Sequence, residues 1–261
     1  MSVLDHRSPT AVGAVMPALK AIMKTYFRSE VRDMDRVPDG GALIVSNHSG
    51  GLTPMDVPII AYALVDEFGS ERPFYVLAHD FIFTGPLGPL MRAMGFLPAS
   101  RENASALLEA GAVTILFPGG DHDVFRPTRE ANRIDFAGRT GYVRVALEAG
   151  VPVVPVVSIG GHETQLYLAR GERLAKLLRL EKLLRTSQAP LILGFPWGVG
   201  GAFPPNLPLP SKIVTQVLDP VHIREEFGDH PDIAEVDEAV RARMQAALDE
   251  LARQRRLPVI G

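Results

Sequence analysis

Two kinds of hydrophobic pattern follow one another along most of this chain. Short uninterrupted apolar runs are typical of strands buried on both faces of a sheet, and longer segments with apolar residues at three- and four-residue steps are typical of helices. The predicted strands are the run that begins at Ala42, then Phe74–Ala78, Ala112–Phe117, Val151–Val157 and Ile213–Leu218. Because strands and helices alternate, we expect an α/β fold with a central, mostly parallel or mixed sheet flanked by helices.

The helical periodicity also predicts how the two ends of the chain are organised. The predicted helices are Ala14–Phe27, Val57–Phe68, Pro86–Met94, Glu102–Ala110, Gly141–Ala149 and Ile233–Leu251. The first is amphipathic and basic; such a helix usually packs on its own domain and sometimes lies on anionic lipid. We therefore expect a single domain over residues 1–261, with an N-terminal amphipathic helical segment (1–40), an α/β core (41–220) and a C-terminal helical segment (221–261).

Composition narrows the class of protein only slightly. The chain has 261 residues and a formal net charge of -3, which gives no reason to expect a nucleic-acid partner. It has no cysteine, which excludes disulfides, thiolate catalysis and cysteine-ligated zinc and fits a reducing compartment. Since no run of 18 apolar residues occurs and the first ten residues are unlike a secretory signal, we expect a cytoplasmic protein that meets a membrane only at its surface.

A histidine and an aspartate flank the glycine turn that follows the Ala42 strand. His48 precedes Gly50-Gly51, and Asp56 stands at the start of the next predicted helix. Ligands collect at the carboxyl ends of strands in α/β proteins, so His48 and Asp56 are candidate site residues. The alternative is that Asp56 caps its helix and His48 only bonds to the loop backbone.

Four short motifs in order resemble those of the glycerolipid and lysophospholipid acyltransferases, in which a His-x4-Asp pair does the chemistry. They are Ser46-Asn47-His48 with Asp56-x-Pro58-x-Ile60, then Gly95-x5-Arg101, then Phe117-Pro118-Gly119-Gly120, then the aliphatic-proline run Val151–Val157. Asp56 comes eight residues after His48 instead of five, which looks like a three-residue insertion. Gly119 replaces the usual glutamate, as in the diacylglycerol and monoacylglycerol acyltransferase branch.

This resemblance implies the roles of several residues. His48 is expected to be the general base and Asp56 its orienting partner, while Arg101 holds the polar head of the acceptor. Backbone N–H groups near Gly119-Gly120 are expected to stabilise the oxyanion. The remaining candidate substrate-binding residues are Phe117, Pro118, Arg126 and Arg139, the two arginines as part of a phosphate-binding rim together with Arg129 and Arg133.

The expected reaction is transfer of a fatty acyl group from acyl-CoA, as co-substrate, to a hydroxyl of a lysophospholipid or an acylglycerol. Arg101 favours a phosphate head on the acceptor, and Gly119 favours a neutral one. With no cysteine and no Gly-x-Ser-x-Gly motif, we expect direct transfer without a covalent acyl-enzyme. Neither a metal nor a cofactor is expected.

Other functions stay open on the sequence alone. A metal-dependent hydrolase could use His48, Asp56 and the run Asp121-His122-Asp123, and a lipid-binding protein would need no chemistry. A membrane surface is an expected partner, because residues 170–185 read as a leucine-rich basic helix. Trp197 and Phe203, in a predicted apolar loop over Leu191–Phe203, could insert at a membrane interface.

Overall fold

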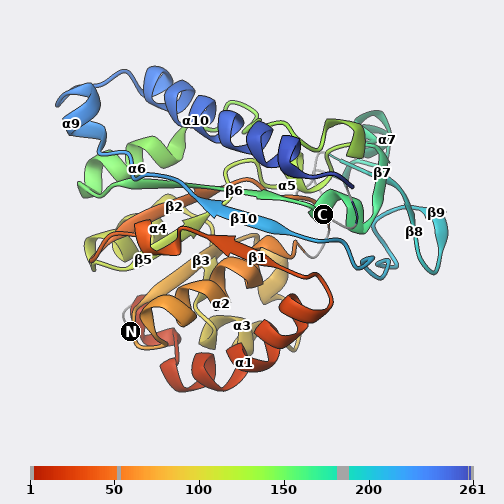
Figure 1. Cartoon of the computed structure of the whole chain (residues 1–261), viewed down its shortest axis with the longest axis horizontal. Helices are drawn as coiled ribbons and strands as arrows, with labels where there is room; N and C mark the ends of the chain where they lie inside the picture. The colour runs from red at the N-terminus through yellow and green to blue at the C-terminus, as the bar shows by residue number, and fades with distance from the viewer. Residues whose placement is uncertain (1–2, 52–53, 181–187, 258, 260–261) are drawn as a thin grey trace.

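The computed structural model describes residues 3–51, 54–180, 188–257 and 259, and its centre is a seven-stranded sheet that lies between two layers of helices (Figure 1). In spatial order the strands are β1 (Glu30–Arg32), β10 (Val214–Val217), β6 (Val153–Ile159), β2 (Ala42–Ser46), β5 (Val113–Leu116), β3 (Phe74–Ala78) and β4 (Phe96–Pro98). The predicted α/β class is confirmed. The short strands β1 and β4 were not predicted, because three residues carry too little pattern.

The sheet is mixed. Strands β6, β2, β5, β3 and β4 are parallel, β10 runs antiparallel to β6, and β1 is parallel to β10. The parallel strands are joined through helices, as parallel pairing requires. Their carboxyl ends therefore lie at one edge of the sheet.

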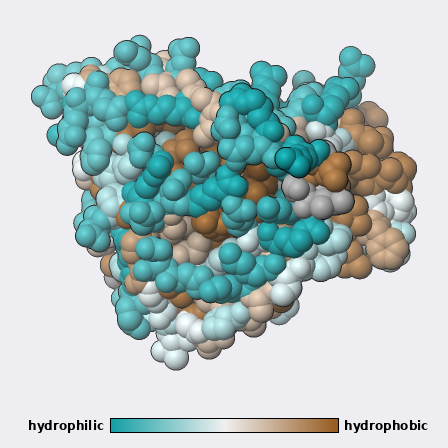
Figure 2. All heavy atoms as spheres, viewed as in Figure 1, coloured by the Kyte–Doolittle hydropathy of each residue, from teal (hydrophilic) through white to brown (hydrophobic). Residues whose placement is uncertain are grey.

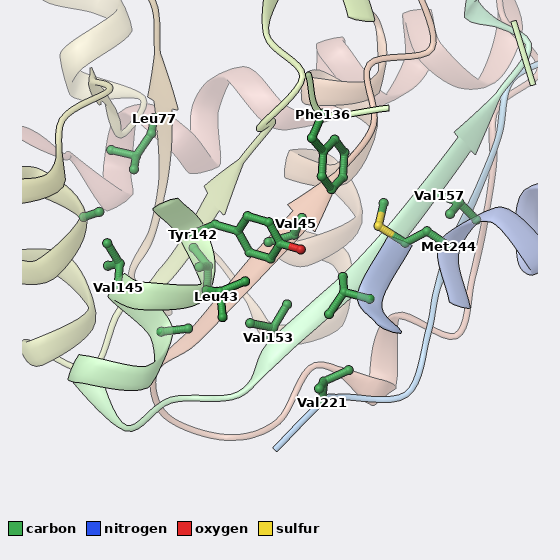
Figure 3. Packing of buried hydrophobic residues seen from close by; sticks show 14 of the residues in the cluster. Leu43, Val45, Leu77, Phe136, Tyr142, Val145, Val153, Val157, Val221 and Met244 are labelled. Carbon is green, nitrogen blue, oxygen red and sulfur yellow. The ribbon is translucent and has the colours of Figure 1, made fainter. Parts of the chain in front are cut away.

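Helices cover both faces of the sheet, so its central strands are apolar throughout. On one side lie α1 (Pro9–Thr25), α2 (Asp56–Phe68) and α3 (Gly88–Ala93), and on the other lie α4 (Arg101–Glu109), α6 (Gly141–Ala149) and α10 (Ile233–Gln254) (Figure 1). Strand β2 is buried along its whole length. Leu43 and Val45 pack with Tyr142 and Met244 in one cluster (Figure 3), whereas Ile44 belongs to the cluster on the opposite face.

The predicted N-terminal and C-terminal helices are both present. Ser8 caps α1 by accepting a hydrogen bond from the N–H of Ala11, and Asp232 caps α10 in the same way. Helix α1 buries its apolar side against α2, and its Lys20 pairs with Asp66 at 2.6 Å. The basic helix at the N-terminus thus packs on its own chain.

A second, three-stranded antiparallel sheet contains β7 (Leu166–Ala169), β8 (Leu191–Gly194) and β9 (Gly198–Gly200). The predicted apolar loop over Leu191–Phe203 was wrong, because β8 and β9 form a hairpin inside it. Alternation of polar and apolar residues is the usual sequence signature of a half-exposed strand, and the residues of β8 and β9 do not alternate in this way.

The predicted leucine-rich basic helix is only partly described. Helix α7 spans Glu172–Leu177 and is followed by Arg179 with a positive φ of 52°. The rest of that prediction, residues 181–185, lies outside the described residues. The shorter elements are η1 (Val3–His6), η2 (Met34–Arg36), η3 (Asp80–Phe83), α5 (Asp121–Val124), η4 (Thr128–Glu130), η5 (Gly161–Thr164) and α9 (Ile223–Phe227). Among the helices of the described ranges, none is long and apolar enough to cross a bilayer.

Because β2 is buried on both faces, substitutions of neighbouring residues in this strand test the packing on opposite faces of the sheet. Leu43→Ala and Ile44→Ala should each lower the free energy of unfolding by about 2–5 kcal/mol, because each removes apolar atoms and leaves a cavity. Ile22→Ala, at an exposed position of α1, should change it by less than about 0.5 kcal/mol. Denaturant unfolding measures all three, and a small effect of either β2 substitution would show that its face is not covered in solution.

Candidate active site

The candidate site lies at the carboxyl ends of three neighbouring strands, β5, β2 and β6. Strand β2 is followed by Asn47 and His48, β5 by Phe117, and β6 by Gly160-Gly161-His162. Because these strands are parallel and adjacent, the residues that follow them meet at one edge of the sheet.

His48 and Asp56 form a close pair. The Nδ1 atom of His48 lies 2.9 Å from Oδ2 of Asp56, and the carboxylate is completely buried. A carboxylate only accepts hydrogen bonds, so the proton of this bond belongs to Nδ1 and Nε2 remains as the proton acceptor. The hydroxyl of Ser49 donates to the other oxygen of Asp56 at 2.5 Å. The structure therefore brings together the two residues that the sequence singled out.

The longer spacing between His48 and Asp56 is absorbed by the loop between β2 and α2. Gly50 and Gly51 have φ of 110° and 99°, which favour glycine, and a Cβ on Gly50 would collide with His162. Asp56 is the first residue of α2, whose N-cap is Met55, and its side chain turns to His48 and Ser49 instead of capping the helix. Residues 52 and 53 lie outside the described residues.

Two neighbours fix the orientation of the histidine. The ring of His48 stacks on the ring of Phe117 with centroids 4.0 Å apart and planes 1° apart. The side-chain amide of Asn47 donates to the carbonyl of Ser158 and accepts from its N–H, both at 2.9 Å. This pair of bonds ties the end of β2 to β6, so His48 leaves the strand from a fixed point.

The turn Phe117-Pro118-Gly119-Gly120 is held by Arg139. The guanidinium of Arg139 donates to the carbonyls of Pro118 at 3.2 Å and Gly119 at 2.7 Å and pairs with Asp121 at 2.9 Å. The N–H of Gly120 donates to the carbonyl of Phe117, so it is not available to an oxyanion. Within the described part of the chain, the N–H of Gly119 makes no hydrogen bond and remains available as a donor.

A buried ion pair lies under this turn. Asp123 pairs with Arg126 three residues on, and the other carboxylate oxygen of Asp123 accepts a long hydrogen bond, 3.4 Å, from the backbone N–H of His48. Burial raises the pKa of Asp123 to about 6, against the opposing effects of Arg126 and His48. A Cβ on Gly119 would collide with the Asp123 carboxylate, which therefore occupies the space that the usual glutamate side chain of the motif would enter.

A buried histidine, His162, lies beside the pair. His162 contacts Gly50, and its Nε2 has no hydrogen-bond partner among the described residues. Burial, followed by the charge of Arg126, lowers the pKa of His162 to about 4. This ring is therefore neutral at physiological pH and adds no charge next to His48.

The predicted arginines do not form a phosphate-binding rim. Arg126 is buried and neutralises Asp123, and Arg139 is committed to the Pro-Gly-Gly turn. Arg101 is the first residue of α4, is largely exposed and pairs with Glu148 at 2.5 Å, and none of its contacts involves a residue of the site. Arg129 pairs with its neighbour Glu130. The sequence could not show which partners these arginines bind, because the choice of partner depends on which groups folding brings within reach.

The metal alternative finds no support in the geometry. Asp121 turns to Arg139, His122 to Asp135 and Asp123 to Arg126, so the three consecutive side chains point to different partners. No group of three or more histidine or carboxylate side chains suited to a metal occurs within the described ranges.

Sequence reasoning missed several residues of the site. Asn47 was read only as part of a motif, Asp123 only as a possible metal ligand, and Ser49 and His162 were not considered as site residues. One signal was present: His162 follows a glycine pair at the end of a predicted strand, as His48 precedes one. Because the carboxyl ends of neighbouring parallel strands meet at one edge of the sheet, this pattern is consistent with His162 and His48 lying together.

Comparison with known proteins places this geometry in a family context. Residues 28–159 match the family model described as Acyltransferase. An uncharacterized protein of Mycobacterium tuberculosis is 32% identical over 248 residues, covering 93% of this chain and 66% of the relative. A mouse protein named DGAT1/2-independent enzyme synthesizing storage lipids is 30% identical over 190 residues, covering 72% of this chain and 55% of its own. The chain thus spans between about half and two thirds of the length of these relatives.

A solved structure shares the fold. The crystal structure of the 1-acyl-sn-glycerophosphate acyltransferase of Thermotoga maritima superposes with a TM-score of 0.58 at 17% identity. The match covers 92% of this chain and 81% of that one. At this identity the likeness concerns the fold.

The lowered pKa of His162 predicts a specific pH dependence of stability. Between pH 6.5 and about 4 the unfolded chain binds a proton on this ring that the folded chain does not, so stability is lost as the pH falls. The advantage of the parent over His162→Gln should shrink by as much as ~3 kcal/mol across that window. Asp123 acts in the opposite direction but is present in both proteins.

Denaturant unfolding at several pH values measures this difference. His230→Gln, which changes an exposed histidine, should give a curve parallel to that of the parent. Parallel curves for His162→Gln and the parent would contradict the assignment of a buried, neutral ring.

The Asp123 carboxylate occupies the space that a side chain at position 119 would need. We therefore expect substitutions of Gly119 and Asp123 to have non-additive effects on the free energy of unfolding. Gly119→Glu should displace the Asp123 carboxylate, and Asp123→Gly should leave Arg126 buried without its counter-ion, at a cost of about 3–5 kcal/mol. In the double variant the new glutamate can take the vacated place, so the loss of unfolding free energy should be clearly smaller than the sum of the two single losses. A double-mutant cycle measures this coupling, and additive losses would show that the two side chains do not share the space.

Proposed function

Since the chain belongs to the acyltransferase family, we propose that it is a glycerolipid O-acyltransferase that moves a fatty acyl group from acyl-CoA to the hydroxyl of an acylglycerol at a membrane surface. The observation that carries the proposal is the His48–Asp56 pair, 2.9 Å apart at the carboxyl edge of the sheet. The named activity of the storage-lipid relatives supports the choice of a glycerolipid substrate.

In the proposed reaction the chain's own residues handle one proton. The acceptor hydroxyl oxygen attacks the thioester carbonyl carbon while Nε2 of His48 takes the hydroxyl proton. Asp56 stabilises the imidazolium through Nδ1, and Ser49 fixes the carboxylate. The carbon–sulfur bond then breaks, and His48 returns the proton to the coenzyme A thiolate. The N–H of Gly119 is the turn's donor for the oxyanion.

Transfer in one displacement suits this site. A thioester is already activated, and the chain has no cysteine to carry an acyl group. Ser49 is the hydroxyl nearest the pair, but it donates to the buried Asp56 and is itself buried. We therefore assign it a positioning role.

The surroundings of the pair favour a neutral acceptor over a lysophospholipid. All five arginines that the sequence offered for a phosphate have another partner. Arg101 binds Glu148, Arg126 binds Asp123, and Arg139 binds the turn and Asp121. The exposed Arg129 and Arg133 lie next to Glu130 and Asp135. A phosphate head would have to compete with these carboxylates. We propose a monoacylglycerol or diacylglycerol as the acceptor class.

The proposal is tested by product analysis after the purified protein is incubated with acyl-CoA and a panel of monoacylglycerol, diacylglycerol and lysophospholipids. His48→Ala should lower turnover by about 10²–10⁴-fold, because it removes the general base. Asp56→Asn should also lower turnover, since the amide cannot stabilise the imidazolium. The exposed control His230→Ala should leave turnover unchanged.

Retained turnover in His48→Ala would remove this residue from the mechanism. Preference for lysophospholipids over neutral acylglycerols would overturn the choice of acceptor while leaving the reaction class intact. Absence of acyl transfer to every acceptor would overturn the proposed function itself.

A further inference from the structure

The outer face of the small sheet is apolar where an antiparallel sheet normally faces water with polar residues. Leu166, Leu193 and Val199 are paired in register across β7, β8 and β9, and all three are exposed. On the inner face Tyr167 and Ile192 are also paired and are almost fully buried. Both faces of this sheet are thus apolar, and only one is covered by the chain.

Aromatic side chains extend this face beyond the strands. Phe195 and Trp197 lie between β8 and β9, and Phe203 follows β9. With the three aliphatic residues above, they form what we term the hairpin face: Leu166, Leu193, Phe195, Trp197, Val199 and Phe203. Their exposed fractions lie between 40% and 63%. Figure 2 shows brown, hydrophobic atoms gathered at the right-hand edge of the molecule, where Figure 1 places β8 and β9.

The hairpin face reaches toward the edge of the main sheet that carries the site. Phe203 packs against Phe81, with ring centroids 6.2 Å apart, and Phe81 belongs to η3, which directly follows β3. Strand β3 is paired with β5, whose end supplies Phe117 to the site. The contact between Phe203 and Phe81 therefore links the hairpin face to the segment that follows β3 at the carboxyl edge of the sheet.

The charges beside the hairpin face are mostly positive. Residues 170–179, which directly follow β7, include four basic residues and one acidic residue. Arg173, Lys176 and Arg179 are exposed there, next to the exposed Leu177. Basic residues near an anionic lipid surface add attraction, and apolar side chains between them enter the interface.

The indole of Trp197 has the amphipathic character of an interfacial residue. Its Nε1 donates to the carbonyl of Pro205 at 3.1 Å while the ring is exposed. A tryptophan with a satisfied polar end and a free apolar ring is typical of the boundary between lipid and water.

We propose that the hairpin face is the surface with which this protein docks on a lipid bilayer, its aromatic residues entering the interface and residues 170–179 contacting anionic head groups. The choice of a bilayer over a protein partner depends on the proposed function, because an acylglycerol acceptor is delivered from lipid. It also depends on the adjacent positive charge. Docking on this face brings the carboxyl edge of the sheet toward the membrane.

The test uses the fluorescence of Trp197, which is the only tryptophan in the chain. The full chain is titrated with phosphatidylcholine–phosphatidylglycerol vesicles at low salt. The emission of Trp197 should shift to shorter wavelength and be quenched by lipids with brominated acyl chains. The variant Phe195→Gln/Phe203→Gln, which retains Trp197, should bind at least tenfold more weakly. Ile22→Gln, an exposed apolar residue of α1, should bind like the parent.

A second variant tests the electrostatic part. Arg173→Gln/Lys176→Gln/Arg179→Gln should weaken binding to anionic vesicles and leave the weaker binding to pure phosphatidylcholine unchanged. Circular dichroism and thermal unfolding show whether each variant remains folded. The proposal would be overturned if both variants bound vesicles as tightly as the parent. It would also be overturned if the parent did not bind vesicles at low salt. Association of the parent with itself that the Phe195→Gln/Phe203→Gln variant loses, without vesicle binding, would identify a second copy as the occupant instead.

Failure of the proposed docking surface and failure of the proposed reaction can be told apart. His48→Ala should bind vesicles as well as the parent. Phe195→Gln/Phe203→Gln should retain turnover on a short-chain, water-soluble acylglycerol and lose it on vesicle-borne acceptor. Vesicle binding without any turnover by the parent would overturn the reaction but not the docking surface.

Discussion

A buried carboxylate with two hydrogen bonds is the constraint on which the site depends. An isolated charge in the position of Asp56 would be strongly destabilising, so His48 and Ser49 must both reach it. Its place at the first residue of α2 adds the favourable dipole of the helix N-terminus. These needs fix the path of the loop between β2 and α2, including the glycine at position 50 that lets His162 pack against the backbone. A spacing of eight residues between His48 and Asp56 is therefore compatible with the pair.

The sheet supplies the rigid frame for this loop. Parallel strands buried on both faces have little freedom to shift, because a slip by one residue would exchange the two apolar clusters around Leu43 and Ile44. The ends of β5, β2 and β6 are consequently held side by side. Phe117 can stack on His48, and Asn47 can bond to Ser158, only in that register.

The charged side chains around the site neutralise one another in ion pairs. Asp123 neutralises Arg126, Asp121 pairs with Arg139, and His162 is kept neutral by burial. Asp123 also occupies the space beside Gly119, so a carboxylate lies under the turn even though the motif lacks its glutamate. This arrangement has a consequence for substrate choice: the arginines near the turn are already balanced, which suits an acceptor without a phosphate.

The sequence by itself determined the α/β class, the five longer strands of the main sheet and the helices at both ends, and it singled out His48 and Asp56 as candidates. Each of these depends on local periodicity or on residues a few positions apart, which a linear pattern records. Only the tertiary structure decided which strands are neighbours, that β7, β8 and β9 form a second sheet, and that His162 lies next to His48. The physical reason is that these features arise from contacts between distant segments: Asn47 and Ser158 are 111 residues apart, and Arg101 and Glu148 are 47 apart. A long polar side chain binds whichever partner folding brings within reach, so the roles of the arginines could not be deduced before the fold was known.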